Sequence, residues 1–289
     1  MKKPAWLRKP LPMGPEYERV RSMMKGECLH TVCQEAKCPN QWECFSRQTA
    51  TFLIMGDRCT RNCRFCAVLH GPVGAVDPEE PSRVADAARA LGLNYVVVTS
   101  VTRDDLPDGG AEIFARTIRE IHRKKPGSEV EVLIPDFQGD PQALATVLHA
   151  HPAVLNHNIE TVARLYPAVR PGAAYERSLE LLAKAHAHVP AVPVKSGMML
   201  GLGETEAEVK KTLVDLFEAG CRLLTLGQYL QPSAHHLPVE RFVPPEEFDA
   251  WKAFARDLGF RGVASGPFVR SSYQAGEMYG AVAGSAATA

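Results

Sequence analysis

The chain has 289 residues, of which 45% are hydrophobic and 23% charged, as in an ordinary globular protein with one large or two modest α/β domains. Its 33 Lys and Arg balance 33 Asp and Glu, so we expect no nucleic-acid partner, because binding to a phosphate backbone needs excess positive charge. No apolar run is as long as a membrane helix, and residues 1–10 lack the apolar segment of a secretory signal. We therefore expect a cytoplasmic protein without a membrane partner.

The sequence divides into three parts. Residues 1–50 are rich in Pro, Cys and charge, and we expect an N-terminal extension with a short helix at 16–25. In residues 51–230, short apolar runs alternate with helical segments. The expected strands are 51–55, 94–100, 129–134, 154–158, 192–200 and 223–228. The expected helices are 82–91, 111–124, 141–149, 173–186 and 205–219, with a short one near 161–166. Residues 231–289 form a C-terminal extension with a helix at 245–258 and an Ala/Gly-rich tail, 281–289, that we expect to fray.

This alternation predicts parallel βαβ units and an α/β fold. Six units favour a partial (β/α)6 barrel; a full barrel and a doubly wound open sheet are the alternatives. In such barrels the chemistry lies at the carboxyl ends of the strands. A cysteine-rich loop follows the first expected strand, and polar residues such as Thr99 and Asn158 end later ones. We therefore expect these groups at one mouth.

Seven of the eight cysteines lie between residues 28 and 66. A disulfide framework would need an oxidising compartment, so a cytoplasmic chain favours metal binding or redox chemistry. Two triads stand out, Cys59-x3-Cys63-x2-Cys66 and Cys33-x4-Cys38-x5-Cys44. Structural zinc takes four ligands, whereas a 4Fe-4S cluster can take three thiolates and leave its fourth iron open or for a remote ligand. Zinc remains the alternative for each triad, and the two together could hold two zinc ions.

These motifs resemble a known family. A C-x3-C-x2-C loop after the first strand of a (β/α) barrel is similar to radical S-adenosylmethionine enzymes, and the second triad, within residues 31–44, narrows the resemblance to the lipoyl synthase family. Further segments similar to this family are 156–161, 201–205, 226–232 and 270–273 (Arg-Ser-Ser-Tyr). The resemblance runs from about Trp6 to Tyr273, and the two triads with the terminal Arg-Ser-Ser-Tyr are its most specific part.

The resemblance implies that Cys59, Cys63 and Cys66 hold a 4Fe-4S cluster with one iron open to the amino and carboxylate groups of S-adenosylmethionine. One electron then cleaves the sulfonium and gives a radical that abstracts hydrogen from an unactivated carbon, which no side-chain base could do. These three cysteines are therefore expected to be catalytic as well as metal ligands.

The resemblance also implies an auxiliary 4Fe-4S cluster on the other triad, Cys33, Cys38 and Cys44. Its fourth iron would be bound by a serine of the terminal motif, Ser272 rather than Ser271, and the cluster would donate sulfur. A serine oxygen is a harder and less usual ligand than a thiolate, which suits a cluster that must open. From the dipeptide alone, a polar turn is the alternative.

The implied reaction inserts two sulfur atoms at carbons 6 and 8 of a protein-bound octanoyl-lysine, using two molecules of S-adenosylmethionine. The implied carriers are the glycine cleavage H protein and the lipoyl domains of 2-oxoacid dehydrogenases. Further expected partners are a low-potential electron donor, either ferredoxin or flavodoxin, and an iron–sulfur carrier protein.

Other polar or flexible positions are weaker candidates for contacts with S-adenosylmethionine. These candidates are Asn158, Glu160, Gly109, Gly110, Gly201 and Gln228. The alternative for Asn158 and Glu160 is a satisfied polar network, and for Gly109 and Gly110 a turn or helix cap. A Gly-x-Gly motif such as the one at Gly201 is weak evidence when it stands alone. Arg170 and Lys195 could pair with a carboxylate or with cluster charge, and a surface cation is the alternative for both.

Rival functions remain at this stage. Another sulfur-inserting radical enzyme, such as a biotin synthase or a methylthiotransferase, is the nearest. A biotin-synthase-like protein should carry auxiliary cysteines on later strands, where only Cys221 occurs. A methylthiotransferase should add a basic RNA-binding domain. The rival from a different class is a zinc-stabilised module without catalysis.

Overall fold

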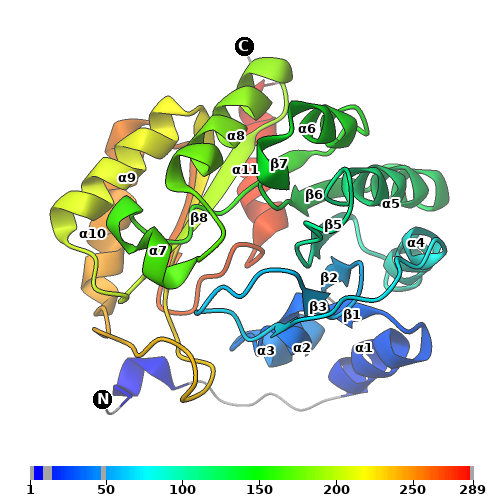
Figure 1. Cartoon of the computed structure of the whole chain (residues 1–289), viewed down its shortest axis with the longest axis horizontal. Coiled ribbons are helices and arrows are strands. Elements are labelled where there is room, and N and C mark those ends of the chain that lie inside the picture. Colours follow the sequence, from blue (N-terminus) through cyan, green and yellow to red (C-terminus); the bar gives the residue numbers. More distant parts are fainter. Residues whose placement is uncertain (1–2, 9–14, 47–49, 287–289) are drawn as a thin grey trace. The chain divides into compact units, whose positions relative to one another are not determined.

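A computed structural model describes residues 3–8, 15–46 and 50–286. The chain divides into two compact units, which are treated separately (Figure 1). The N-terminal unit consists of the described residues within Pro10–Asn62 and Cys66–Leu155. The C-terminal unit consists of the described residues within Met1–Lys9, Cys63–Phe65 and Asn156–Ala289.

The N-terminal unit is built on a mostly parallel sheet with the strand order β1-β2-β5-β6-β7. The strands are β1 (His30–Thr31), β2 (Thr51–Ile54), β5 (Tyr95–Ser100), β6 (Glu129–Leu133) and β7 (Val154–Asn156). Strand β1 is antiparallel to β2, whereas β2, β5 and β6 are parallel, with Thr51 opposite Val97 and Val97 opposite Glu131. A separate parallel pair, β3 (Arg58–Cys59) and β4 (Leu69–His70), brackets the cysteine loop.

Helices flank these strands in the chain. They are α1 (Pro15–Gly26), α2 (Val32–Glu35), α3 (Gln41–Ser46), α4 (Glu80–Ala90), α5 (Ala111–Lys124), the 3-10 turn η2 (Phe137–Gly139) and α6 (Pro141–Leu148). Helix α5 forms because its apolar residues recur at helical spacing: Phe114, Ile118 and Ile121 lie on one face and are fully buried. Helix α6 begins where the Asp140 carboxylate accepts a hydrogen bond from Gln142 N.

The C-terminal unit contains three parallel strands in the order β8-β9-β10. These are β8 (Val194–Leu200), β9 (Cys221–Gln228) and β10 (Gly262–Gly266). Its helical elements are η1 (Ala5–Leu7), η3 (Ala163–Leu165), α7 (Tyr166–Val169), α8 (Tyr175–His188), α9 (Glu206–Glu218), α10 (Pro245–Leu258) and α11 (Ala275–Ala286). Helix α9 starts with a capping box in which Thr205 and Glu208 satisfy each other's backbone N–H groups.

The six predicted strands are confirmed as β2, β5, β6, β7, β8 and β9, and each precedes a helix in the chain. The short edge strands β1 and β10 are additions that the sequence pattern did not predict. The tail expected to fray at 281–289 instead continues α11 as far as Ala286, because Met278 and Val282 are buried; residues 287–289 lie outside the described part. None of the described helices is long and apolar enough to cross a membrane.

Candidate functional site

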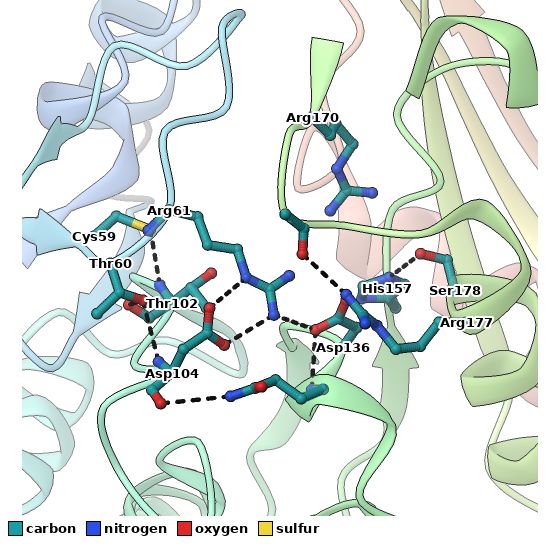
Figure 2. Close-up of polar contacts among 12 residues, drawn as sticks. Cys59, Thr60, Arg61, Thr102, Asp104, Asp136, His157, Arg170, Arg177 and Ser178 are labelled. Carbon is teal, nitrogen blue, oxygen red and sulfur yellow. Dashed lines mark hydrogen bonds and ion pairs between the residues drawn. The ribbon is translucent and has the colours of Figure 1, made fainter. Parts of the chain in front are cut away.

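The C-x3-C-x2-C loop begins at Cys59, the last residue of β3. The Cys59 Sγ accepts hydrogen bonds from two backbone N–H groups, Arg61 N at 3.4 Å and Thr102 N at 3.2 Å (Figure 2). Thr60 reinforces this arrangement, since its N and Oγ1 both donate to Thr102 O. Residue 102 follows β5, so this thiol lies at the carboxyl end of that strand, as expected for chemistry in such a fold.

A second feature of this loop is the side chain of Arg61, which sequence reasoning missed. Its Nε and one terminal nitrogen form a fork with Asp104 at 2.6 and 2.8 Å, and it also contacts Asp136 Oδ1 at 2.6 Å (Figure 2). Asp136 is fully buried. Burial disfavours the charged guanidinium, but the hydrogen bonds that it donates to Asp104 and Asp136 outweigh this cost and raise the pKa of Arg61.

The segment Cys63–Phe65 belongs to the C-terminal unit. Arg64 N donates to Val169 O at 2.9 Å, and Arg64 O accepts from Leu237 N at 3.1 Å. Phe65 packs against a buried cluster of Val169, Leu202 and Tyr229. These contacts fix the backbone on the carboxyl side of Cys63.

A polar group follows β7 in the C-terminal unit. Asn158 Nδ2 donates to Glu160 Oε1 at 2.9 Å and to Ser271 Oγ at 2.6 Å, and Arg170 donates to Asn158 O at 2.9 Å. Glu160 has a φ of +65°, a strained value for a residue with a side chain and one that is often found at functional sites. Burial raises the pKa of Glu160, although Arg170, Asn158 and Arg270 favour its carboxylate.

Two polar atoms of this group have no hydrogen-bond partner among the described residues. They are Asn158 Oδ1 and Arg170 Nε, both buried. For Arg170, burial works against the charge, but Tyr166, Glu160 and Cys63 raise its pKa. An acceptor and a charged donor buried without partners are groups that a polar ligand would satisfy.

The terminal Arg-Ser-Ser-Tyr motif lies beside Asn158 through Ser271. Gly197 on β8 makes room for this cluster: an added Cβ would be 2.5 Å from Thr225 Oγ1, 2.7 Å from Asn158 Oδ1 and 3.2 Å from Ser271 Oγ. Ser271 is therefore the serine of the motif that accepts a hydrogen bond from Asn158.

The second cysteine triad lies within the N-terminal unit. Cys38 N donates to Cys33 O at 3.0 Å, and Cys44 N donates to Asn40 O at 2.9 Å. Burial raises the pKa of Cys33 to about 12, and Cys38 and Cys44 raise it too, which requires the three sulfurs to be near one another. None of the eight cysteines, all of them described, is in a disulfide. Within the described ranges, no three His, Cys, Asp or Glu side chains surround a single ion position.

The other predicted cofactor contacts have structural partners. Gly109 and Gly110 take φ values of +61° and +90° at the start of α5, where the Asp108 carboxylate accepts from Gly110 N. Gly201 (φ +100°) is followed by Glu204, whose carboxylate accepts from Gly201 N. Contacts of these glycines with a cofactor stay predictions.

Gln228 at the end of β9 is fully buried. Its amide donates to the carbonyls of Leu200, Tyr229 and Arg241 and accepts from Val243 N at 2.7 Å. Lys195 is fully buried on β8, so it is not a surface cation. Cys221 is buried at the first residue of β9, and Cys28 is exposed.

Comparisons with known proteins agree with this arrangement. Residues 53–216 match the model of the radical SAM superfamily, and residues 1–38 match the model of the N-terminal domain of lipoyl synthase. A lipoyl synthase from Desulfotalea psychrophila is 59% identical over 96% of this chain and 93% of its own length. Another from Thermus thermophilus is 56% identical, covering 96% of this chain and 86% of its own length.

Solved structures with low sequence identity share the fold. The hydrogenase maturase HydG has a TM-score of 0.57 at 16% identity, covering 85% of this chain and 65% of its own. Methylornithine synthase has a TM-score of 0.50 at 14% identity, covering 78% of this chain and 67% of its own. Together with the superfamily match of residues 53–216, these structures confirm the expected partial barrel of the radical SAM type.

Proposed function

Because this chain belongs to the lipoyl synthase family of radical S-adenosylmethionine enzymes, we propose that Cys59, Cys63 and Cys66 hold one of its two 4Fe-4S clusters. The second, auxiliary cluster is assigned to the other cysteine triad. The enzyme is a sulfurtransferase that uses S-adenosylmethionine to insert sulfur at carbons 6 and 8 of a protein-bound octanoyl-lysine. The expected family and activity are thus confirmed, and neither a biotin-synthase-like enzyme nor a zinc module is needed to explain the motifs.

The chemistry of the donors fits the auxiliary cluster. Cys33 is buried close to Cys38 and Cys44, and both burial and these neighbours raise the pKa of Cys33, so this thiol is costly to ionise without a cation. Binding to iron would stabilise all three thiolates together. Three thiols leave one iron corner for another ligand. We assign it to Ser272 by similarity of Arg270–Tyr273 to the terminal Arg-Ser-Ser-Tyr motif of the family.

The polar group after β7 fits a zwitterionic ligand such as S-adenosylmethionine. The Asn158 Oδ1 and Arg170 Nε atoms without partners offer an acceptor and a charged donor. Glu160 is strained and next to both residues, and its carboxylate suits an ammonium group. We therefore assign cofactor orientation to Asn158 and Glu160, with Arg170 as a further contact. Gly109, Gly110, Gly201 and Gln228 remain proposed contacts.

When bound, the reduced cluster and S-adenosylmethionine supply the radical chemistry that breaks unactivated C–H bonds. The protein residues hold and orient these groups. Backbone N–H groups of Arg61 and Thr102 fix Cys59 Sγ, and Phe65 packing fixes the chain after Cys63. The buried polar side chains keep water from replacing the ligand contacts.

The partners follow from this chemistry. We propose that the octanoyl-lysine is presented by the glycine cleavage H protein or by lipoyl domains of 2-oxoacid dehydrogenases. A ferredoxin or flavodoxin would supply electrons, and an iron–sulfur carrier protein would rebuild the auxiliary cluster. Thiolate clusters of this kind suit a reducing compartment, so we propose a cytoplasmic location.

Anaerobic turnover with an octanoyl-lysine peptide, with the product mass as readout, tests the function. Cys63→Ala should abolish S-adenosylmethionine cleavage. Cys38→Ala should retain cleavage but block sulfur insertion. If Cys38→Ala still makes lipoyl product, the second triad is not the sulfur donor. Measuring iron and acid-labile sulfide in the same samples separates a lost cluster from a lost step.

The serine assignment needs its own comparison. Ser272→Ala should slow sulfur insertion while cleavage of S-adenosylmethionine continues. Ser271→Ala is the matched control, and it should instead weaken S-adenosylmethionine binding by releasing Asn158. The opposite pattern would make Ser271 the iron ligand.

A further inference from the structure

Arg61, Asp104 and Asp136 form a set of ion pairs that we call the Arg61 clamp. All three residues lie in the N-terminal unit. Asp104 is 43 positions and Asp136 is 75 positions after Arg61 in the sequence. The Arg61 side chain is only 7% exposed and the Asp136 side chain 0%. A bidentate Arg–carboxylate fork is geometrically rigid, and a buried one is screened little by water.

The clamp connects the two chain segments whose backbone N–H groups donate to Cys59 Sγ. One donor belongs to Arg61 itself, and the other to Thr102, two residues before Asp104. Thr60 connects the same two segments a second time, since its Oγ1 donates to Thr102 O and accepts from Asp104 N at 3.1 Å. Figure 2 shows this closed arrangement around Cys59 and Thr60. The side chain of Arg61 therefore fixes the position of its own N–H and of the Thr102 N–H.

Hydrogen bonds to a cluster thiolate stabilise the reduced form of the cluster, because reduction adds negative charge to the iron and sulfur atoms. Two fixed N–H donors on one ligand sulfur should therefore raise the reduction potential. Groups of this kind around a metal ligand commonly change activity by about 10- to 100-fold when they are removed.

We propose that the Arg61 clamp is a positioning device that holds two N–H donors on Cys59 Sγ and thereby raises the reduction potential of the cluster that binds S-adenosylmethionine. The inference rests on the proposed role of Cys59 as a ligand of that cluster. Arg61 and Asp104 are positioning residues, since they act on the sulfur through backbone groups. The clamp thus sets how strong an electron donor the enzyme needs.

The neighbouring pair Arg103–Asp105 provides a matched control. It has the same forked geometry, with distances of 2.8 and 2.7 Å, and a carboxylate that is 36% exposed, close to the 29% of Asp104. Asp105→Asn and Asp104→Asn therefore make the same chemical change in the same loop. In Asp104→Asn the buried Asp136 keeps its ion pair with Arg61. The loss of the Arg61–Asp104 fork therefore leaves no buried carboxylate without its cation.

The experiment uses the anaerobic holoenzyme. The electron paramagnetic resonance signal that changes on addition of S-adenosylmethionine reports the relevant cluster, and its midpoint potential is measured by redox titration. Asp104→Asn and Arg61→Lys should shift this midpoint to more negative values, whereas Asp105→Asn should match the unmodified enzyme. Formation of 5′-deoxyadenosine with dithionite should fall about tenfold in the clamp variants and recover with titanium(III) citrate, a stronger reductant.

Hydrogen–deuterium exchange of the cluster-free protein gives a second readout. Peptides covering residues 58–62 and 101–104 should exchange faster in the clamp variants than in Asp105→Asn. The proposal is overturned if a clamp variant that binds its cluster has the same midpoint potential as Asp105→Asn. It is also overturned if a clamp variant that binds no cluster shows the same hydrogen–deuterium exchange as Asp105→Asn. If Cys59→Ala keeps the signal that responds to S-adenosylmethionine, the ligand assignment has failed rather than the clamp.

Discussion

Replacing Gln228 with leucine tests whether this buried amide is a structural group or a cofactor contact. Leucine nearly fills the same volume, so the main loss is hydrogen bonding. Val243 N loses its acceptor at 2.7 Å, and the carbonyls of Tyr229 and Arg241 lose donors at 2.9 and 3.0 Å. Leu200 O keeps the backbone N–H of Tyr229. Three backbone groups therefore lose their Gln228 partner, and at about 1 kcal/mol each this predicts a loss of about 3 kcal/mol in the free energy of unfolding.

Urea unfolding followed by circular dichroism measures this loss, with Gln231→Leu as the control. The Gln231 amide donates to His236 O at an exposed site, so its removal should change the free energy of unfolding by less than about 0.5 kcal/mol. Equilibrium binding of S-adenosylmethionine is measured on both variants. If Gln228→Leu unfolds at the same urea concentration as the unmodified protein but loses S-adenosylmethionine binding, the structural reasoning is refuted.

Three further predictions concern stability. Gly110→Ala should cost at least about 2 kcal/mol, because φ is +90° and the new methyl group would overlap the Met55 side chain; Gly92→Ala, with φ +69° and open space around it, should cost about 1 kcal/mol, and equal losses in thermal unfolding would contradict this. Burial raises the pKa of Glu80 above its ordinary value near 4.5. The contribution of the protonated Glu80 side chain to the free energy of unfolding is therefore complete below pH 4.5, and it is lost as the pH rises through the higher pKa of the folded state. Glu80→Gln, whose amide oxygen can still accept from Met55 N, should therefore gain stability relative to the unmodified protein over this rise, and a pH-independent difference would argue against it. Thr205→Ala should cost about 1 kcal/mol by removing the cap of α9, as denaturant unfolding would show.

Elements with strong local signals could be predicted from the sequence. Helices 111–124 and 245–258 match α5 and α10 residue for residue, because a glycine or proline precedes each helix and apolar residues recur at helical spacing. Strand β10 was missed because Gly262–Gly266 has little apolar alternation. It is a strand because its residues pair with Leu223–Gly227 of β9, a contact that local sequence does not record.

The candidate site shows the same division. The cysteine spacing is local, so both triads could be singled out from the sequence alone. The Arg61 clamp could not, since Asp104 and Asp136 lie far along the chain and each is unremarkable among 33 acidic residues. Gln228 was noticed for its polarity at a strand end, but only the structure reveals four backbone groups around its amide.

The crowding around Gly197 has an evolutionary consequence. Any side chain at this position would displace the hydroxyls of Thr225 and Ser271 and the amide of Asn158, residues drawn from three distant stretches of the chain. Substitution at position 197 is therefore constrained by all three neighbours together, because a new side chain fits only if these polar groups shift. We therefore expect Gly197, Thr225, Asn158 and Ser271 to change together, if they change at all, among related sequences.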